Sequence, residues 1–115
     1  MNTTDWSILT YETGREEKPV DEFIRKQQPQ AKAKIVHSIR LLRQYGNLLG
    51  MPHSKTLGSG LHELRIRGKE ELRLFYCFTS RRAIYLLHAL KKQKQETPQK
   101  EIDIAKKRMQ SLTSI

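Results

Sequence analysis

The stretch from Leu61 to Lys94 decides the fold, and it reads LHELRIRGKEELRLFYCFTSRRAIYLLHALKKQK. Three segments within it are rich in large apolar residues: 61–67, 72–78 and 84–90. The polar segments 68–71 and 79–82 separate them, and connections of that length are typical of hairpins. We therefore expect three strands that form an antiparallel meander.

The first two segments alternate between apolar and charged side chains. Successive residues of a strand point to opposite faces of a sheet, so Leu64 and Ile66 share one face. The other face of that strand takes three charged residues: Glu63, Arg65 and Arg67. In the second segment Arg73 lies between Leu72 and Leu74 in the same way. The pattern predicts a sheet with one apolar face and one arginine-bearing face, which attracts phosphate.

The chain is strongly basic for its size. Its 115 residues include 22 lysines and arginines against 12 aspartates and glutamates, which gives a formal net charge of +10. The balance is 9 against 6 over residues 1–60 and 13 against 6 over residues 61–115. This length corresponds to one domain, residues 1–115, and the charge favours nucleic acid as a partner. The alternative is that the basic surface only keeps the protein soluble.

Cysteine usage and hydropathy indicate the cellular compartment in which the protein is expected. Cys77 is the single cysteine, so neither an intramolecular disulfide nor a cysteine-rich metal site can form. No apolar run approaches the ~18 to 20 residues that span a bilayer, and residues 1–5 lack the profile of a signal peptide. We expect a cytoplasmic protein without membrane attachment.

The first sixty residues predict one strand, two helices and a loop. Residues 6–12 are rich in aromatic and β-branched side chains and stop before Gly14, which predicts a first strand. Apolar residues recur at helical spacing over residues 19–29, and a second, longer series occupies residues 30–45. Residues 48–60 contain four glycines or prolines and no periodicity, so we expect a loop of the length that often carries function.

A last helix is predicted near the C-terminus. Thr97 can cap its first free amides, and Pro98 suits the first helical position. An apolar stripe follows: Ile102, Ala105, Met109 and Leu112. We expect this helix to cover the apolar face of the sheet or to pack on its edge. The fold class is then α+β, with a small antiparallel sheet (one N-terminal strand plus the meander), two N-terminal helices and a C-terminal helix.

The arginine-bearing face suits the cleavage of RNA without a metal. In that reaction the ribose 2′-hydroxyl is the nucleophile, and the protein must remove its proton, neutralise charge on phosphorus and protonate the 5′-oxygen. Arg65 and Arg73 are candidates for the neutralisation, because guanidinium donors match phosphate oxygens and stay charged at every relevant pH. Glu63 could accept the 2′-hydroxyl proton, or it could only form a salt bridge with a neighbouring arginine.

Five further candidate residues each have two interpretations. Lys91 and Lys92, at the end of the third segment, could stabilise charge or donate a proton, or could simply contact phosphate. The apolar surroundings of His88 favour a hydrogen-bonded core histidine over a proton donor. Tyr76 is in phase with apolar residues, so core packing competes with base stacking. Lys55, in the predicted loop, could reach a ligand or lie on a mobile surface.

The set of candidate RNA contacts is completed by two basic residues, Arg67 and Lys94. No metal or other cofactor is expected. The four histidines show no HExxH-like spacing, and no carboxylate constellation suggests a metal cage.

Several motifs follow one another along the chain: Leu57-Gly58-Ser59-Gly60-Leu61-His62-Glu63-Leu64-Arg65, Arg73-Leu74-Phe75-Tyr76, Leu86-Leu87-His88-Ala89-Leu90-Lys91-Lys92, Thr97-Pro98, and a helix with Glu101, Ile102, Ala105 and Arg108. Their order and spacing resemble the RelE/HigB toxin superfamily, specifically its phage-derived HigB-like branch. The likeness runs from the strand near Trp6 to the helix that ends near Met109.

This resemblance implies a RelE-like fold and a type II toxin–antitoxin system toxin that acts as a ribosome-dependent mRNA interferase. In that superfamily, basic residues on a concave face hold and cleave mRNA in the ribosomal A site, which inhibits translation. By motif, Arg65 and Arg73 correspond to arginines of the superfamily, and Lys91 and Lys92 correspond to the basic end of the last strand.

Tyr76 and His88 also match positions of the superfamily, although strand alternation puts both towards the core. The superfamily varies in its acid/base pair, so Glu63, His88 and the lysines are competing assignments. The implied partners are a cognate HigA-like helix-turn-helix antitoxin, the ribosome with its mRNA, and promoter DNA reached only through the antitoxin.

The residues leave two other classes open: a non-catalytic nucleic-acid-binding module, and an inactive relative that only binds a protein partner. Pure binders usually expose several aromatics on the sheet for base stacking. Here Phe75 is the sole aromatic in phase with Arg73, which mildly favours catalysis.

Overall fold

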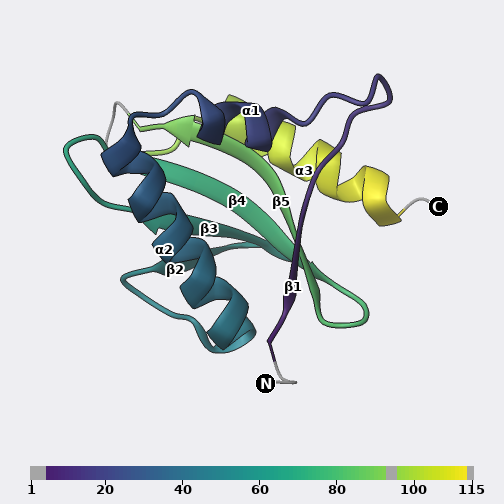
Figure 1. The fold of residues 1–115 in the computed structure, drawn as a ribbon. Coiled ribbons are helices and arrows are strands. Elements are labelled where there is room, and N and C mark those ends of the chain that lie inside the picture. The colour runs from purple at the N-terminus through teal and green to yellow at the C-terminus, as the bar shows by residue number, and fades with distance from the viewer. Residues whose placement is uncertain (1–4, 93–95, 114–115) are drawn as a thin grey trace.

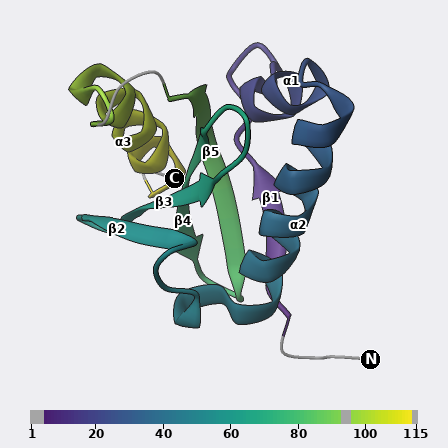
Figure 2. The same cartoon turned by 90° about the vertical axis from the view of Figure 1, so that its left-hand side faces the viewer.

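The computed structural model describes residues 5–92 and 96–113, and over these residues the chain forms three layers (Figure 1). The middle layer is a sheet of five strands: β1 (Ser7–Thr10), β2 (Ser54–Gly58), β3 (Leu61–Ile66), β4 (Leu72–Thr79) and β5 (Ala83–Lys91). Helices α1 (Pro19–Arg25) and α2 (Pro29–Tyr45) cover one face, and α3 (Gln99–Thr113) covers the other (Figure 2). A short 3-10 helix, η1 (Gly46–Leu48), follows α2.

The sheet has the strand order β1-β5-β4-β3-β2. Strands β3, β4 and β5 pair antiparallel, which confirms the predicted meander and the α+β class. Two features differ from the expectation. The second part of the predicted loop is strand β2, which pairs antiparallel with β3, and β1 runs parallel to β5, with Ser7 opposite Ala83. The sheet is therefore mixed, with β1 and β2 at its two edges.

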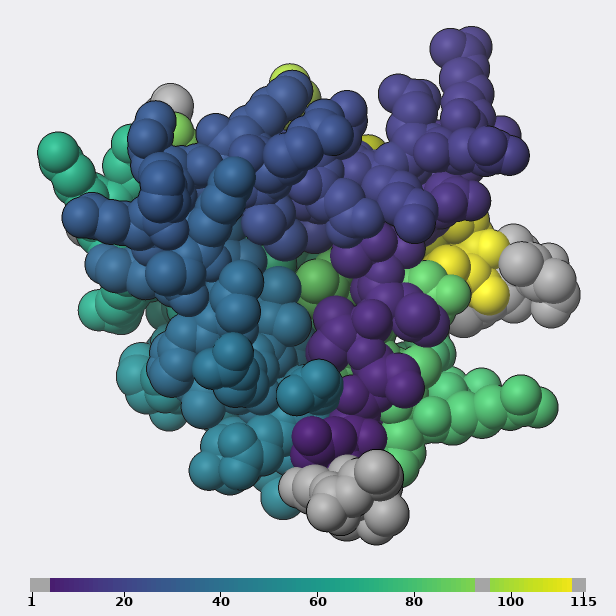
Figure 3. Space-filling view, viewed as in Figure 1, coloured from purple at the N-terminus to yellow at the C-terminus, as the bar shows by residue number. Residues whose placement is uncertain are grey.

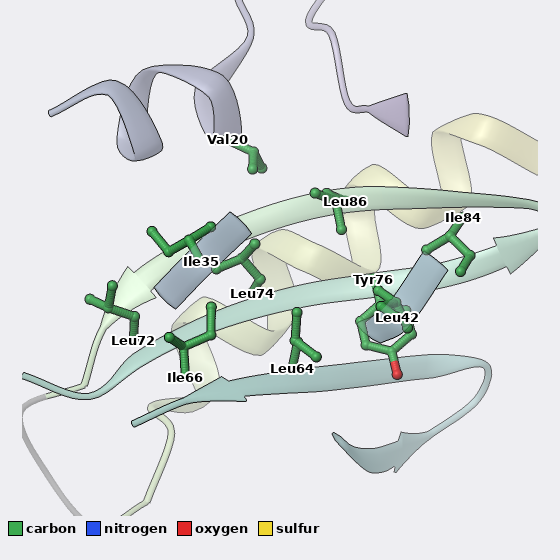
Figure 4. Packing of buried hydrophobic residues seen from close by; sticks show 10 residues of the cluster. All are labelled: Val20, Ile35, Leu42, Leu64, Ile66, Leu72, Leu74, Tyr76, Ile84 and Leu86. Carbon is green, nitrogen blue, oxygen red and sulfur yellow. The ribbon is translucent and has the colours of Figure 1, made fainter. Parts of the chain in front are cut away.

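The main core lies between the two N-terminal helices and the apolar face of the sheet. Its buried residues come from both layers (Figure 4): Val20, Ile35, Leu42, Leu64, Ile66, Leu72, Leu74, Tyr76, Ile84 and Leu86. The alternation within β3 and β4 predicted this face correctly. Burying each large aliphatic side chain contributes about 1.5 to 3 kcal/mol, so this layer holds much of the fold together.

A second, smaller core lies under α3. Its buried residues are Leu61, Phe75, Cys77, Leu87, Leu90 and Ala105. The expectation that the last helix covers the apolar face or the sheet edge is therefore wrong. It packs on the face that bears Glu63 and Arg73, because that face also carries apolar residues between the charged ones. Burial raises the pKa of the Cys77 thiol to about 11.

None of the helices in the described ranges combines the length and the apolar character that a crossing of the bilayer would require.

Candidate functional site

The cross-strand register gathers four of the predicted site residues on the face under α3: Glu63, Arg65, Arg73 and His88. Glu63, Phe75 and His88 form one row across β3, β4 and β5, and Arg65 and Arg73 lie opposite each other in the next row. This arrangement confirms that Glu63, Arg65 and Arg73 share a face. Phe75 is also on this face, but it is fully buried, so the expectation of an exposed aromatic is wrong.

A bulge in β5 decides the position of His88. Phe75 pairs with His88 whereas the next residue, Tyr76, pairs with Leu86, so Leu87 is an extra residue in β5. The bulge puts His88 on the Glu63 face, against the alternation argument that placed it in the main core. Tyr76 does lie in that core, as predicted, where its hydroxyl forms a hydrogen bond with the Ser54 hydroxyl.

Glu63 is the centre of a buried ionic cluster. Its Oε1 accepts hydrogen bonds from Arg73 Nη1 and, at 3.2 Å, from Arg65 Nε. Its Oε2 accepts one from the Thr97 hydroxyl at 2.8 Å. Thr97 therefore links the segment before α3 to the sheet, and α3 itself begins at Gln99. Because the hydroxyl only donates in this contact, the capping of the last helix by Thr97 stays a prediction.

The cluster extends from Arg73 to a second carboxylate. Arg73 Nη2 donates to Glu71 at 3.0 Å, and Lys92 Nζ lies 3.7 Å from the same carboxylate. Partial burial raises the pKa of Glu71, but the nearby charges of Arg73, Lys92 and Arg67 outweigh this effect, so the pKa of Glu71 is lowered. Two carboxylates thus face three cations, Arg65, Arg73 and Lys92, and most of the positive charge is neutralised internally.

The two arginines of the cluster differ in accessibility. The side chain of Arg73 is 2% exposed, whereas that of Arg65 is 16% exposed. The expectation of an open face around Arg73 is therefore wrong, because α3 and the segment before it cover this residue. Arg73 Nε has no hydrogen-bond partner among the described residues. In this conformation Arg65 is the arginine that a phosphate can approach.

His88 is held by two residues of α3. Its Nδ1 lies 3.2 Å from Arg108 Nη1, which can only donate, so Nδ1 is the acceptor and Nε2 carries the proton given to Glu101 at 3.0 Å. Burial lowers the pKa of His88 and Arg108 lowers it further, while Glu101 opposes both effects. The imidazole is therefore neutral near pH 7, hydrogen-bonded on both nitrogens and stacked on Phe75.

Lys55, Lys91 and Arg67 lie outside the ionic cluster, and Lys91, opposite Leu72, is on the other face of the sheet. Lys91 is 44% exposed and pairs with Glu70 at 2.7 Å. Lys55 is exposed on the edge strand β2, directly opposite Glu63, and therefore on the same face. Arg67 is exposed just beyond the end of β3. Lys94 lies outside the described residues.

The partners of His88 were not among the predicted site residues. Glu101 and Arg108 are seven positions apart. This separation is about two helical turns, so both lie on one side of the helix. That spacing is a signal in the sequence, but their meeting with His88 depends on the bulge and on the side of the sheet that α3 covers. Among the described residues, no group of three or more histidine, cysteine, aspartate or glutamate side chains could hold a metal ion.

The fold and the site define a small α+β protein with a charged cluster between its sheet and its C-terminal helix. The chain belongs to the family described as phage derived protein Gp49-like, whose model matches residues 22–110. The matched range begins within α1 and includes every residue of the ionic cluster as well as the His88 partners. No protein with a curated description matches the chain.

Proposed function

We propose that this protein is the toxin of a type II toxin–antitoxin system and cleaves translated mRNA on the ribosome. The observation that carries the proposal is the convergence of Glu63, Arg65 and Arg73 in one cluster beside exposed basic residues. The proposed activity itself is inferred from the resemblance of the motifs to the RelE/HigB superfamily. Membership of the Gp49-like family is consistent with that branch.

The different accessibility of the two arginines supports different roles for them in this proposal. Arg65 is partly exposed, so it is the group that exchanges Glu63 for a phosphate oxygen and neutralises the charge that develops on phosphorus. Arg73 is buried between Glu63 and Glu71 and acts as a positioning residue that holds the Glu63 carboxylate in place. Release of Arg65 from Glu63 frees one lone pair of that carboxylate to accept the 2′-hydroxyl proton.

The proton for the leaving 5′-oxygen comes from one of the cations at the margin of the cluster. Lys92 contacts Glu71 within the ionic cluster, whereas Lys91 pairs with Glu70 outside it. His88 is neutral and both of its nitrogens are occupied, which disfavours it as the acid in this conformation. Because alignment of the 2′-hydroxyl is itself worth about 7 to 11 kcal/mol at best, a ribosome that orders the mRNA would supply much of the rate.

Expression in bacterial cells that lack the neighbouring genes tests the proposal. We expect growth arrest with new 5′ ends inside translated mRNAs, and we expect Arg65→Ala to relieve both. Arg40→Ala, an exposed arginine on α2, is the matched control and should remain toxic. Unimpaired growth on induction, or equal toxicity of Arg65→Ala and the parent protein, would overturn the proposal. A helix-turn-helix antitoxin of the HigA kind is the expected neutraliser.

One observation favours a second candidate function, that of a non-catalytic binder of nucleic acid or of a protein partner. The burial of Arg73 and the double engagement of His88 leave few reactive groups free in this conformation. A binder of this kind would slow growth only through titration of its partner. Mapped 5′ ends separate the two candidates, because a binder would leave the mRNAs uncut.

A further inference from the structure

A second basic surface lies on the α2 side of the sheet, away from α3. Two adjoining cavities of about 830 and 400 Å³ open between α2 and the end of β3, and both are lined by Lys34 and Ile66. The larger one also reaches the turn between β3 and β4, which lies beside the start of α2 in Figure 1. We call these two cavities the α2 groove.

The α2 groove is lined by an excess of positive charge. Its larger cavity carries four lysines, Lys26, Lys34, Lys69 and Lys91, against one acid, Glu70. Lys91 Nζ lies 2.7 Å from Glu70 and neutralises it. Within residues 5–92 and 96–113, no carboxylate forms an ion pair with Lys26, Lys34 or Lys69. Like charges gathered in a concave surface create a field that concentrates anions.

Lys34 has a central position in the groove. A Cβ atom added at Gly68 would lie 2.8 Å from Lys34 Nζ, so this ammonium reaches from α2 to the β3–β4 turn. It stands at the boundary between the two cavities, where Lys69 follows Gly68 directly. The smaller cavity continues the basic lining with two histidines and two arginines, and one of these is Arg65 of the Glu63 cluster: His37, His53, Arg65 and Arg67. The positive charge therefore runs along the groove instead of forming a single point.

We propose that the α2 groove binds the phosphodiester backbone of RNA and, on the basis of the proposed function, extends the RNA path from Arg65 of the Glu63 cluster along α2 to Lys34 and Lys69. The lining residues of α2 run from Pro29 to Ser38, about 13.5 Å along the helix at about 1.5 Å per residue, which is long enough for several phosphates. Lysines and amide side chains such as Gln28 and Gln30 are typical phosphate and sugar contacts.

The lining favours RNA over an acidic protein segment. Protein interfaces concentrate their binding energy in buried aromatic anchors and the pockets that receive them. Among the residues that the structure describes, no phenylalanine, tyrosine or tryptophan lines either cavity. The same absence favours contact with the backbone over stacking of bases. This inference goes beyond the proposed cleavage, because binding in the groove involves no chemistry.

Fluorescence anisotropy with a labelled 2′-O-methyl oligoribonucleotide tests the groove without the proposed reaction, since this RNA has no free 2′-hydroxyl. The variant is Lys34→Glu with Lys69→Glu. The control is Arg15→Glu with Lys107→Glu, which makes the same change in net charge at exposed positions in the turn after β1 and on α3. That turn lies at the upper right of Figure 3, while the start of α2 and the β3–β4 turn lie at the left.

We expect the groove variant to bind the oligonucleotide at least tenfold more weakly at ~0.1 M salt and the control to change it much less. Each lost phosphate contact should flatten the log-log salt dependence by about 0.7, so the groove variant should lose about 1.4. Equal weakening in both variants, or none in either, would overturn the proposal. So would binding of a polyglutamate peptide that depends on Lys34 and Lys69 while RNA binding does not.

The result is independent of the toxin activity. If the oligonucleotide binds through the groove and no mRNA is cut in cells, RNA binding in the groove is supported and the proposed nuclease activity is contradicted. If mRNA is cut and the groove variant binds RNA normally, the nuclease activity is supported and RNA binding in the groove is contradicted.

Discussion

Arg73 and Glu63 form an ion pair whose two side chains are 2% and 1% exposed. Such a pair differs from a surface salt bridge because each charge has lost its water. Glu71 and Thr97 add further hydrogen bonds at its two ends, so the pair is embedded in a network. The residue that strand alternation marked as a phosphate ligand is thus also part of the folded core.

We predict that Arg73→Ala destabilises the protein by about 3 to 5 kcal/mol, because it leaves the buried Glu63 carboxylate without its main counter-charge. Urea unfolding followed by circular dichroism measures this change. Arg65→Ala is the matched comparison and should cost much less, since Glu63 keeps Arg73 and Thr97. Similar urea midpoints for the two variants would show that Arg73 contributes no more to the free energy of unfolding than Arg65 does. Loss of toxicity in Arg73→Ala therefore says little about catalysis, and Arg65→Ala is the sharper test.

A second prediction concerns pH. Burial lowers the pKa of His62 and, with Arg108, that of His88. When the folded pKa of a histidine is depressed, the unfolded chain takes up the proton first, so stability is full above the unfolded pKa of about 6.5 and is lost as the pH falls below it. We expect the melting temperature to decrease from neutral pH towards about pH 5, where these histidines would have to charge.

The His62 contribution can be separated by substitution. The ring of His62 stacks on Tyr76 with centroids 5.3 Å apart and meets the edge of Phe78 at 5.1 Å. His62→Gln should lower the melting temperature at neutral pH and reduce its decrease on acidification. Gln44→Ala, at an exposed position on α2 that carries no titratable group, should leave the pH dependence unchanged. An identical acid-side slope in His62→Gln and the parent protein would rule out His62 as a source of this dependence.

The alternation in β3 and β4 was enough to predict which side chains form the main core and which share the opposite face. It could not predict the bulge at Leu87. One extra residue moves every later side chain of β5 to the opposite face, and the run of apolar residues around it looks the same with or without a bulge. His88 is the residue that this inversion moves. Strand β2 was missed because Lys55 and Thr56 are both exposed on an edge strand and show no apolar alternation.

The candidate site was predictable only as a set of side chains on one face. Whether Glu63 acts as a base or a salt-bridge partner depends on distances, and the structure gives it two arginines and Thr97 as neighbours. The apolar pattern also could not predict which face of the sheet α3 covers, since both faces of the meander carry apolar residues. The α2 groove joins residues distant in the sequence, Lys34 and Lys69, and no periodicity connects them.

A third prediction concerns Gly46, at the end of α2. Its φ is +53°, a region that favours glycine, and an added Cβ would collide with the indole of Trp6. Gly46→Ala should therefore destabilise the protein by more than the roughly 1 to 3 kcal/mol that an unfavourable backbone conformation costs alone. Gly50→Ala is the control, because nothing lies within 4 Å of a Cβ added there. Equal unfolding midpoints for the two variants would contradict the close packing of Trp6 against Gly46.

The last prediction concerns the attachment of α3 to the sheet. Arg108 Nη1 donates to the backbone oxygen of Leu87 at 2.9 Å and to His88 Nδ1 at 3.2 Å, and its guanidinium lies 5.3 Å from the ring centre of Tyr11. Arg108→Ala removes all three contacts and leaves two acceptors without this donor. We expect it to cost about 1 to 3 kcal/mol, which corresponds to roughly fivefold to 150-fold faster exchange of the α3 amide hydrogens.

Lys107→Ala is the matched control for this variant, because Lys107 is the exposed neighbour on the same helix. Its α3 amides should exchange at the parental rate. A second readout is the pKa of His88, which NMR can follow: removal of the Arg108 charge should raise it, since that charge lowers it in the parent protein. Unchanged α3 exchange together with an unchanged His88 pKa would mean that Arg108 does not anchor the helix. Faster exchange in Arg108→Ala alone would establish that one side chain couples α3 to the strand carrying the bulge.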